Sequence, residues 1–193
     1  MASIVIVFHS GYGHTRKQAE AVHAGAAAAA GAQVESLAID AEGNLPDGSW
    51  NKLAAADAIV FGAPTYMGGP SWQFKKFADA SAKPWSGQAW KNKVAAGFTN
   101  SATINGDKFS TISYMFTLAM QQAMIWVGTG LMPANVKAST RNDVNWLGGF
   151  GGTLAQSPAD VGADEGPLPG DLETARLFGA RVAETALRFK RGA

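Results

Sequence analysis

The sequence contains no cysteine and only three histidines among its 193 residues. The absence of cysteine excludes disulfide bonds and thiol catalysis, and the few histidines leave no ligand set for a closed zinc site. The chain also lacks a basic and apolar leader pattern and any apolar run of about 18 residues. From these absences we expect a soluble protein of the reducing cytoplasm that holds no metal and does not enter a membrane.

Charge is scarce and evenly divided between the two signs. Charged residues make up 16% of the chain, and 16 basic residues against 15 acidic ones leave a net charge of +1. No basic stripe for nucleic acid and no polybasic face for a membrane can be built from this balance. The G-x-S-x-G elbow of a serine hydrolase is missing as well. With 47% hydrophobic residues, the chain is expected to form a single domain over residues 1–193.

What the sequence does contain is a series of short apolar runs separated by helical patterns. The runs cover Ile4–His9, Val34–Ile39, Ala58–Ala63, Val94–Phe98 and Met124–Gly128. Runs of this length and spacing are typical of βαβ units with a buried parallel sheet. The sequence therefore predicts an α/β fold, a sandwich with helices on both faces of a five-stranded sheet.

Helical patterns between the runs predict five helices. We expect them at about Thr15–Ala30 and Ser49–Ala56, and starting near Ser71, Phe109 and Asp171. In the fourth helix, apolar side chains recur at three- and four-residue steps, which predicts that this stripe belongs to the core. The stripe consists of Ile112, Phe116, Ala119, Met120 and Ala123.

The segment Ser10–Thr15, directly after the first strand, has the composition of an anion-binding loop. Glycines at 11 and 13 allow backbone N–H groups to converge, and the hydroxyls of Ser10 and Thr15 and a helix N-terminus add to them. The loop lacks the lysine of a triphosphate loop, and Arg16 stands where a dinucleotide loop needs a small residue. These features favour a terminal monophosphate. The alternative is a simple helix cap, because Thr15 and Gln18 also fit a capping box.

Two further loops follow the third and fourth predicted strands. Pro64–Gly68 and Thr99–Thr103 are rich in hydroxyl groups and small residues. In an open parallel sheet, such loops lie at the carboxyl ends of the strands, where ligands bind. We therefore expect both loops to line one crevice with the anion-binding loop.

Taken together, these three loops and Trp85 resemble the WrbA-type NAD(P)H:quinone oxidoreductases of the flavodoxin-like superfamily. The resemblance extends over nearly the whole chain and implies a three-layer sandwich with strand order 2-1-3-4-5. It also implies FMN as cofactor, NAD(P)H as electron donor and a quinone as acceptor. Members of this family are tetramers whose neighbouring subunits complete the site, so a homodimer or homotetramer is expected.

The resemblance assigns FMN contacts to three segments and leaves the chemistry to the flavin, so no side chain is assigned as a catalyst. The expected contacts are Ser10, Gly11, Tyr12, Gly13, His14 and Thr15 at the phosphate; Pro64, Thr65, Tyr66, Met67 and Gly68 at the ring edge; and Thr99, Asn100, Ser101, Ala102 and Thr103 at the polar rim and ribityl chain. Trp85 is expected to wall the ring on the substrate side.

The sequence departs from the family where a histidine pair is usual near the flavin. Gln121 and Gln122 stand there instead, and Gln122 is expected to offer an amide to the substrate. An amide cannot become cationic, so the rate and substrate preference stay open, and Gln122→His is expected to raise quinone reduction. Two other functions also remain open, a one-electron carrier of the flavodoxin type and a regulatory FMN-binding protein with little turnover.

Overall fold

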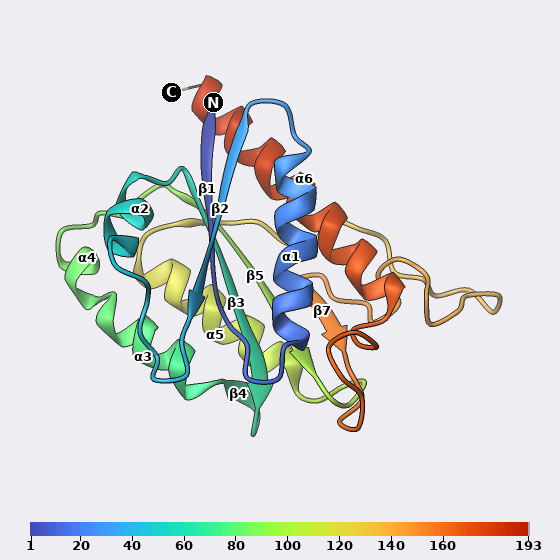
Figure 1. Cartoon of the computed structure of the whole chain (residues 1–193). Helices are drawn as coiled ribbons and strands as arrows, with labels where there is room; N and C mark the ends of the chain where they lie inside the picture. Colours follow the sequence, from blue (N-terminus) through green and yellow to red (C-terminus); the bar gives the residue numbers. More distant parts are fainter. Residues whose placement is uncertain (193) are drawn as a thin grey trace.

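The computed structural model describes residues 1–192 and shows a sheet with helices on both faces (Figure 1). Parallel strands run in the order β2-β1-β3-β5-β6, which confirms the predicted order, with β5 and β6 as the fourth and fifth strands. The strands are β1 (Ala2–His9), β2 (Ala32–Ile39), β3 (Ala58–Tyr66), β4 (Gly69–Pro70), β5 (Val94–Ser101), β6 (Ile125–Trp126) and β7 (Thr153–Gln156).

The helices form the two outer layers. They are α1 (His14–Ala27), α2 (Ser49–Ala55), α3 (Trp72–Ala80), α4 (Ala82–Ser86), α5 (Lys108–Gln121) and α6 (Pro169–Arg191). One core lies between the sheet and the pair α1 and α6, which pack side by side (Figure 1). The other core lies between the opposite face and α2, α3 and α5. Within residues 1–192, no helix combines the length and apolar character needed to cross a bilayer.

The apolar runs become strands because both faces of the central sheet are covered. Successive side chains of a strand point to opposite faces, so Ile4 and Ile6 enter one core while Val5 and Val7 enter the other. A strand buried on both sides needs apolar residues at every position, and β1 provides them from Ile4 to Phe8. The continuous run in the sequence therefore predicts the strand and its central place.

The fifth strand is divided, and this corrects the single run expected at Met124–Gly128. Only Ile125 and Trp126 pair there, with the first part of β5. The chain then leaves the sheet and returns as β7, which pairs with the last four residues of β5, Phe98–Ser101. The carboxyl end of β5 is thus flanked by a strand that the sequence pattern does not reveal.

The predicted core stripe of the fourth helix is only partly correct. In α5, Ile112 and Ala119 are buried, but Phe116 and Met120 are 43% and 41% exposed. The core-facing side of the helix consists of Ile112, Met115 and Ala119, so Phe116 and Met120 lie outside the packed core. Trp126 packs edge-on against the half-exposed Phe116 and donates its indole N–H to the Gly151 carbonyl.

Candidate functional site

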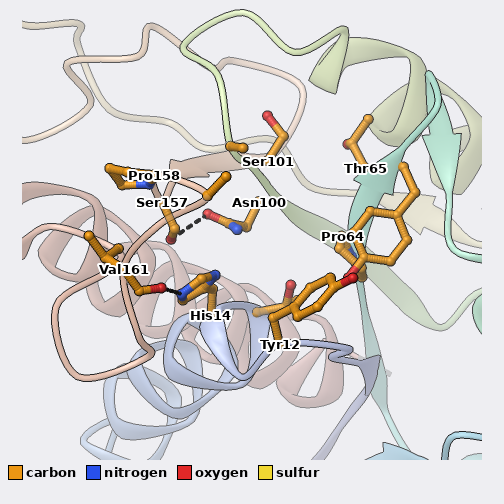
Figure 2. Close-up of a pocket in the computed structure, with 13 residues that line it drawn as sticks. Tyr12, His14, Pro64, Thr65, Asn100, Ser101, Ser157, Pro158 and Val161 are labelled. Carbon is orange, nitrogen blue, oxygen red and sulfur yellow. Dashed lines mark hydrogen bonds between the residues drawn. The ribbon is translucent and has the colours of Figure 1, made fainter.

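A cleft of about 480 Å³ opens at the carboxyl ends of β1, β3 and β5, where the three predicted loops meet. Figure 2 shows side chains from all three loops around it. Nine of the predicted contact residues line this cleft: Tyr12, His14, Thr15, Pro64, Thr65, Tyr66, Asn100, Ser101 and Ala102. The volume lies within the usual range for a cofactor or small-molecule site.

The loop after β1 presents the start of α1 to the cleft. Gly13 is the N-cap with φ of 90°, a left-handed conformation that glycine adopts without strain, and it has no side chain to cap the helix. The capping-box alternative is therefore wrong, because α1 starts at His14 and Thr15 lies inside it. Ser10 Oγ accepts the N–H of Arg16 at 3.1 Å, which leaves its own proton to donate. The other first-turn N–H groups can face an anion.

Two tyrosines form the rim of the cleft beside this loop. The rings of Tyr12 and Tyr66 meet edge-to-face with centroids 6.2 Å apart. A side chain at Gly11 would lie 2.6 Å from the hydroxyl oxygen of Tyr66, so a larger residue there would displace the Tyr66 ring from this position. Burial, with a smaller effect of Tyr12, raises the pKa of Tyr66 above its usual value. The phenol therefore stays neutral and can donate a hydrogen bond.

Hydroxyl groups tie the floor of the cleft to the layer below. Thr65 Oγ1 lies 2.8 Å from Thr99 Oγ1 and 2.7 Å from Thr111 Oγ1, and all three side chains are buried. This network joins the ends of β3 and β5 to α5. The strand ends are thereby fixed relative to each other, as a rigid cofactor seat requires.

His9 connects the end of β1 to the start of α3. The side chain is 3% exposed, and its Nδ1 lies 2.8 Å from Ser71 Oγ. Burial lowers the pKa of His9 below its ordinary value, so the imidazole is neutral at pH 7. The residue therefore holds the first two loops together without adding charge.

A fourth wall comes from the segment after β7, which the sequence analysis did not assign to the site. Ser157, Pro158, Ala159 and Val161 line the cleft (Figure 2). Ser157 Oγ donates to Asn100 Oδ1 at 3.1 Å, and His14 Nε2 donates to the Val161 carbonyl at 3.1 Å. In the sequence, the short run Thr153–Ala155, followed after Gln156 by Ser157-Pro158, is the signal that could have indicated this wall.

The remaining predicted contacts lie around the cleft. The first loop also contains Ser10, Gly11 and Gly13, which do not line the wall of the cleft. Thr99 is buried in the floor of the cleft. Met67 is fully exposed at the tip of the β3–β4 hairpin, with φ of 46°. The Gly68 carbonyl accepts the hydroxyl of Ser110, and Thr103 is held by Lys108 from behind its loop.

The two predicted substrate contacts, Trp85 and Gln122, do not lie at this cleft. Both line a separate hollow between α4 and the end of α5. Trp85 is half exposed there, whereas Gln122 is buried, and its amide donates to the carbonyl and the hydroxyl of Ser81. Gln122 thus serves to attach α4 to α5, which corrects its expected place beside the substrate.

The cleft fits a phosphorylated cofactor with a flat ring. Among the residues that the structure describes, no carboxylate lines it, so an anion meets no like charge. A helix N-terminus with free N–H groups lies at one end, and tyrosines, Pro64 and Pro158 offer flat apolar surfaces at the sides. FMN, with one terminal phosphate and a planar ring, matches this donor set.

Residues 5–136 match the family model described as NADPH-dependent FMN reductase. The chain belongs to this family. Within it, the chain is a WrbA-type protein with a flavodoxin-like fold: it superposes on the WrbA-like flavodoxin of Agrobacterium tumefaciens with a TM-score of 0.76. That match has 49% identity and covers 97% of this chain and 99% of the other.

Two relatives of this FMN reductase family member have names that point to different activities. Flavodoxin FldP of Pseudomonas aeruginosa is 52% identical over 183 residues, which are 95% of this chain and 96% of that protein. An NAD(P)H dehydrogenase (quinone) of Geotalea uraniireducens is 33% identical over 208 aligned positions, covering 97% and 99%. Both relatives match along the full fold rather than in one motif.

Proposed function

We propose that this protein binds FMN in the cleft and transfers two electrons from NAD(P)H to a quinone-type acceptor. The observation that carries the proposal is the convergence of the three predicted loops at one cleft with a free helix N-terminus. The family match and the relative named for quinone reduction support it. When bound, FMN would supply the hydride acceptance and electron transfer that no side chain here can perform.

The residues of the chain hold and orient the cofactor in this proposal. The start of α1 and the hydroxyls of Ser10 and Thr15 bind the phosphate. The 64–68 and 99–103 loops hold the ring, and the hydroxyl network below fixes these loops. Pro158 and Val161 exclude water from the inner side, and nicotinamide and then quinone would use the side of the ring left open to solvent.

A one-electron carrier is the second candidate, because flavodoxin FldP is 52% identical. Carriers of this kind usually present a strongly acidic face to basic partners. With 16 basic and 15 acidic residues, this chain offers no such excess. The enzyme is therefore the function that we favour, and direct reduction by a nicotinamide separates the two.

We further propose that the protein assembles as a homodimer or homotetramer through α5. From Phe109 to Gln121 this helix contains no charged residue. Phe109, Phe116 and Met120 are exposed on it. A surface helix without charge is unusual for a monomer, and depletion of charge is typical of interface centres. Trp85, half exposed on α4, would then meet the cleft of a neighbouring copy rather than its own.

The binding step can be tested by titration of FMN fluorescence. The wild type is expected to quench FMN with a dissociation constant below about 100 μM, or ~5.5 kcal/mol. Ser10→Ala removes a phosphate donor and is expected to weaken binding about tenfold. Ser86→Ala, which removes an exposed hydroxyl on α4, serves as the matched control and leaves binding unchanged.

Electron transfer is then followed by stopped-flow absorbance of the FMN-loaded protein with NADH, NADPH and a small quinone. Bleaching of the flavin by one nicotinamide and its recovery with quinone are expected. Loaded protein that only dithionite reduces would reject the enzyme in favour of the carrier. Absence of FMN binding would reject both.

A further inference from the structure

Lys108, the first residue of α5, is buried to 1% exposure behind the loop that follows β5. Lysine is almost never fully buried unless its charge is paired. Among the described residues no carboxylate forms an ion pair with it. Its Nζ instead donates to Ser101 Oγ at 2.8 Å and to the carbonyls of Thr103 and Ile104 at 2.6 and 2.7 Å. All three N–H donors of the ammonium group are thus used on this one loop.

A second side chain binds the same loop. Gln156 Nε2 donates to the Ala102 carbonyl at 2.7 Å. Gln156 is itself held because its backbone N–H donates to Asp171, whose carboxylate forms a two-pronged pair with Arg141. Three consecutive carbonyls, from 102 to 104, are therefore bound by side chains.

Bound carbonyls determine where the neighbouring N–H groups point. In a trans peptide the C=O of one residue and the N–H of the next lie on opposite sides. With the 102–104 carbonyls directed at Gln156 and Lys108, the N–H groups of residues 103–105 are directed away from these side chains. Ala102–Asn105 are exposed on the surface, so these donors are open to a ligand.

We propose that Lys108 is a positioning residue of the FMN site, which fixes the 101–107 loop with its N–H groups toward the flavin and places a positive charge behind Ser101. The inference rests on the proposed function. Ser101 lines the cleft and accepts a hydrogen bond from Lys108, so the charge lies one hydroxyl group from the wall. Reduction adds negative charge to a bound flavin, and a nearby cation in a poorly solvated place stabilises that charge.

The charge state of Lys108 agrees with this role. Burial lowers its pKa to about 8, an effect that Asp171 opposes and Arg141 reinforces. At pH 7 the side chain is therefore still mainly an ammonium group. Gly106 closes the loop against Ser101, because a side chain at 106 would lie 2.1 Å from Ser101 Oγ.

The test compares the midpoint potential of bound FMN at pH 7 in the wild type, Lys108→Met and Lys108→Gln. Both variants remove the charge, and glutamine keeps an amide donor for the loop. The equilibrium constant for two-electron reduction is expected to fall about tenfold in both, which is about 30 mV. Lys91→Met, at the opposite end of β5, removes the same formal charge and is expected to leave the potential unchanged.

Hydrogen exchange gives a second readout, which does not require that the variants fold. Adding FMN is expected to protect the amides of Ile104 and Asn105, and Lys108→Met is expected to weaken that protection more than Lys108→Gln. Absence of protection in the wild type would overturn the proposal even where neither variant folds.

The possible failures are distinguishable. A wild type that does not bind FMN overturns both the proposed function and the part played by Lys108. The second possible result is that the wild type binds FMN and takes electrons from NAD(P)H, while both Lys108 variants keep the wild-type midpoint potential. This result overturns only the inference about Lys108.

Discussion

His9 gives a pH dependence to stability because its imidazole is buried and neutral. Burial lowers its folded-state pKa, so below about pH 6.5 the unfolded chain binds more protons than the native protein. The contribution of His9 to the free energy of unfolding is therefore fully present above that pH. It is lost as the pH falls below it, by at most ~1.4 kcal/mol per pH unit. Urea unfolding between pH 5 and 8 measures this loss.

The matched variants are His9→Asn and His23→Asn. Both histidines contact a serine hydroxyl through Nδ1, but the contact of His23 with Ser36 is exposed. His9→Asn is expected to flatten the pH dependence, and His23→Asn is expected to preserve it. Parallel curves for wild type and His9→Asn would contradict this account.

Lys108 and Gln122 show why single side chains were the least predictable part of the molecule. A lysine before an apolar stripe is typical of an exposed helix start, and nothing local in the sequence indicates that three oxygen atoms surround it. The family resemblance predicts Gln122 beside the flavin, at the place of a histidine. The structure uses it instead to bind Ser81, 41 positions away in the chain.

The crossing of α1 and α6 depends on two glycines. A side chain at Gly25 would lie 1.7 Å from the Arg176 carbonyl oxygen, and one at Gly179 would lie 2.0 Å from that of Val22. The helix backbones therefore approach closer than any Cβ allows. Since α6 covers one face of the sheet, this contact also fixes that core.

Gly25→Ala is expected to destabilise the protein by roughly 2 kcal/mol through overpacking. The sign of this change in stability is informative, because replacing glycine by alanine in an exposed helix interior would instead add about 0.5 to 1 kcal/mol of stability. Gly87→Ala is the control, since a side chain there meets only the Pro84 carbonyl at 4.0 Å. A urea midpoint for Gly25→Ala at or above that of wild type would disprove the close-packing account.

Strands and loops were predictable where a signal was continuous along the chain. The runs of β1, β3 and β5 and the loops after them follow from apolar patterning, and their meeting point follows from the parallel sheet. β7 was missed because its four residues become a strand only through pairing with β5, 55 positions earlier at Asn100 and Ala155. The wall at Ser157–Val161 was missed for the same reason. The short α4 was missed because Pro84 interrupts the pattern.

Assembly through α5 can be tested with a charge on its uncharged face. Met120→Lys is expected to convert the proposed oligomer to a monomer of 20.1 kDa by light scattering at micromolar concentration, because a lysine must be desolvated at the interface centre. The control is Phe189→Lys, because Phe189 is half exposed on α6 in the opposite layer. This variant is expected to remain an oligomer. A wild type that is itself monomeric with FMN bound would refute the assembly.

The divided fifth strand also determines how other chains can pair with the edge of the sheet opposite β2. A long, flat edge strand offers an unbroken row of N–H and C=O groups that another sheet can extend. Here the edge consists of two residues in β6 and four in β7, with residues 127–152 leaving the sheet between them. The interruption thus leaves the edge too short to template the strand-to-strand aggregation to which continuous edges are prone.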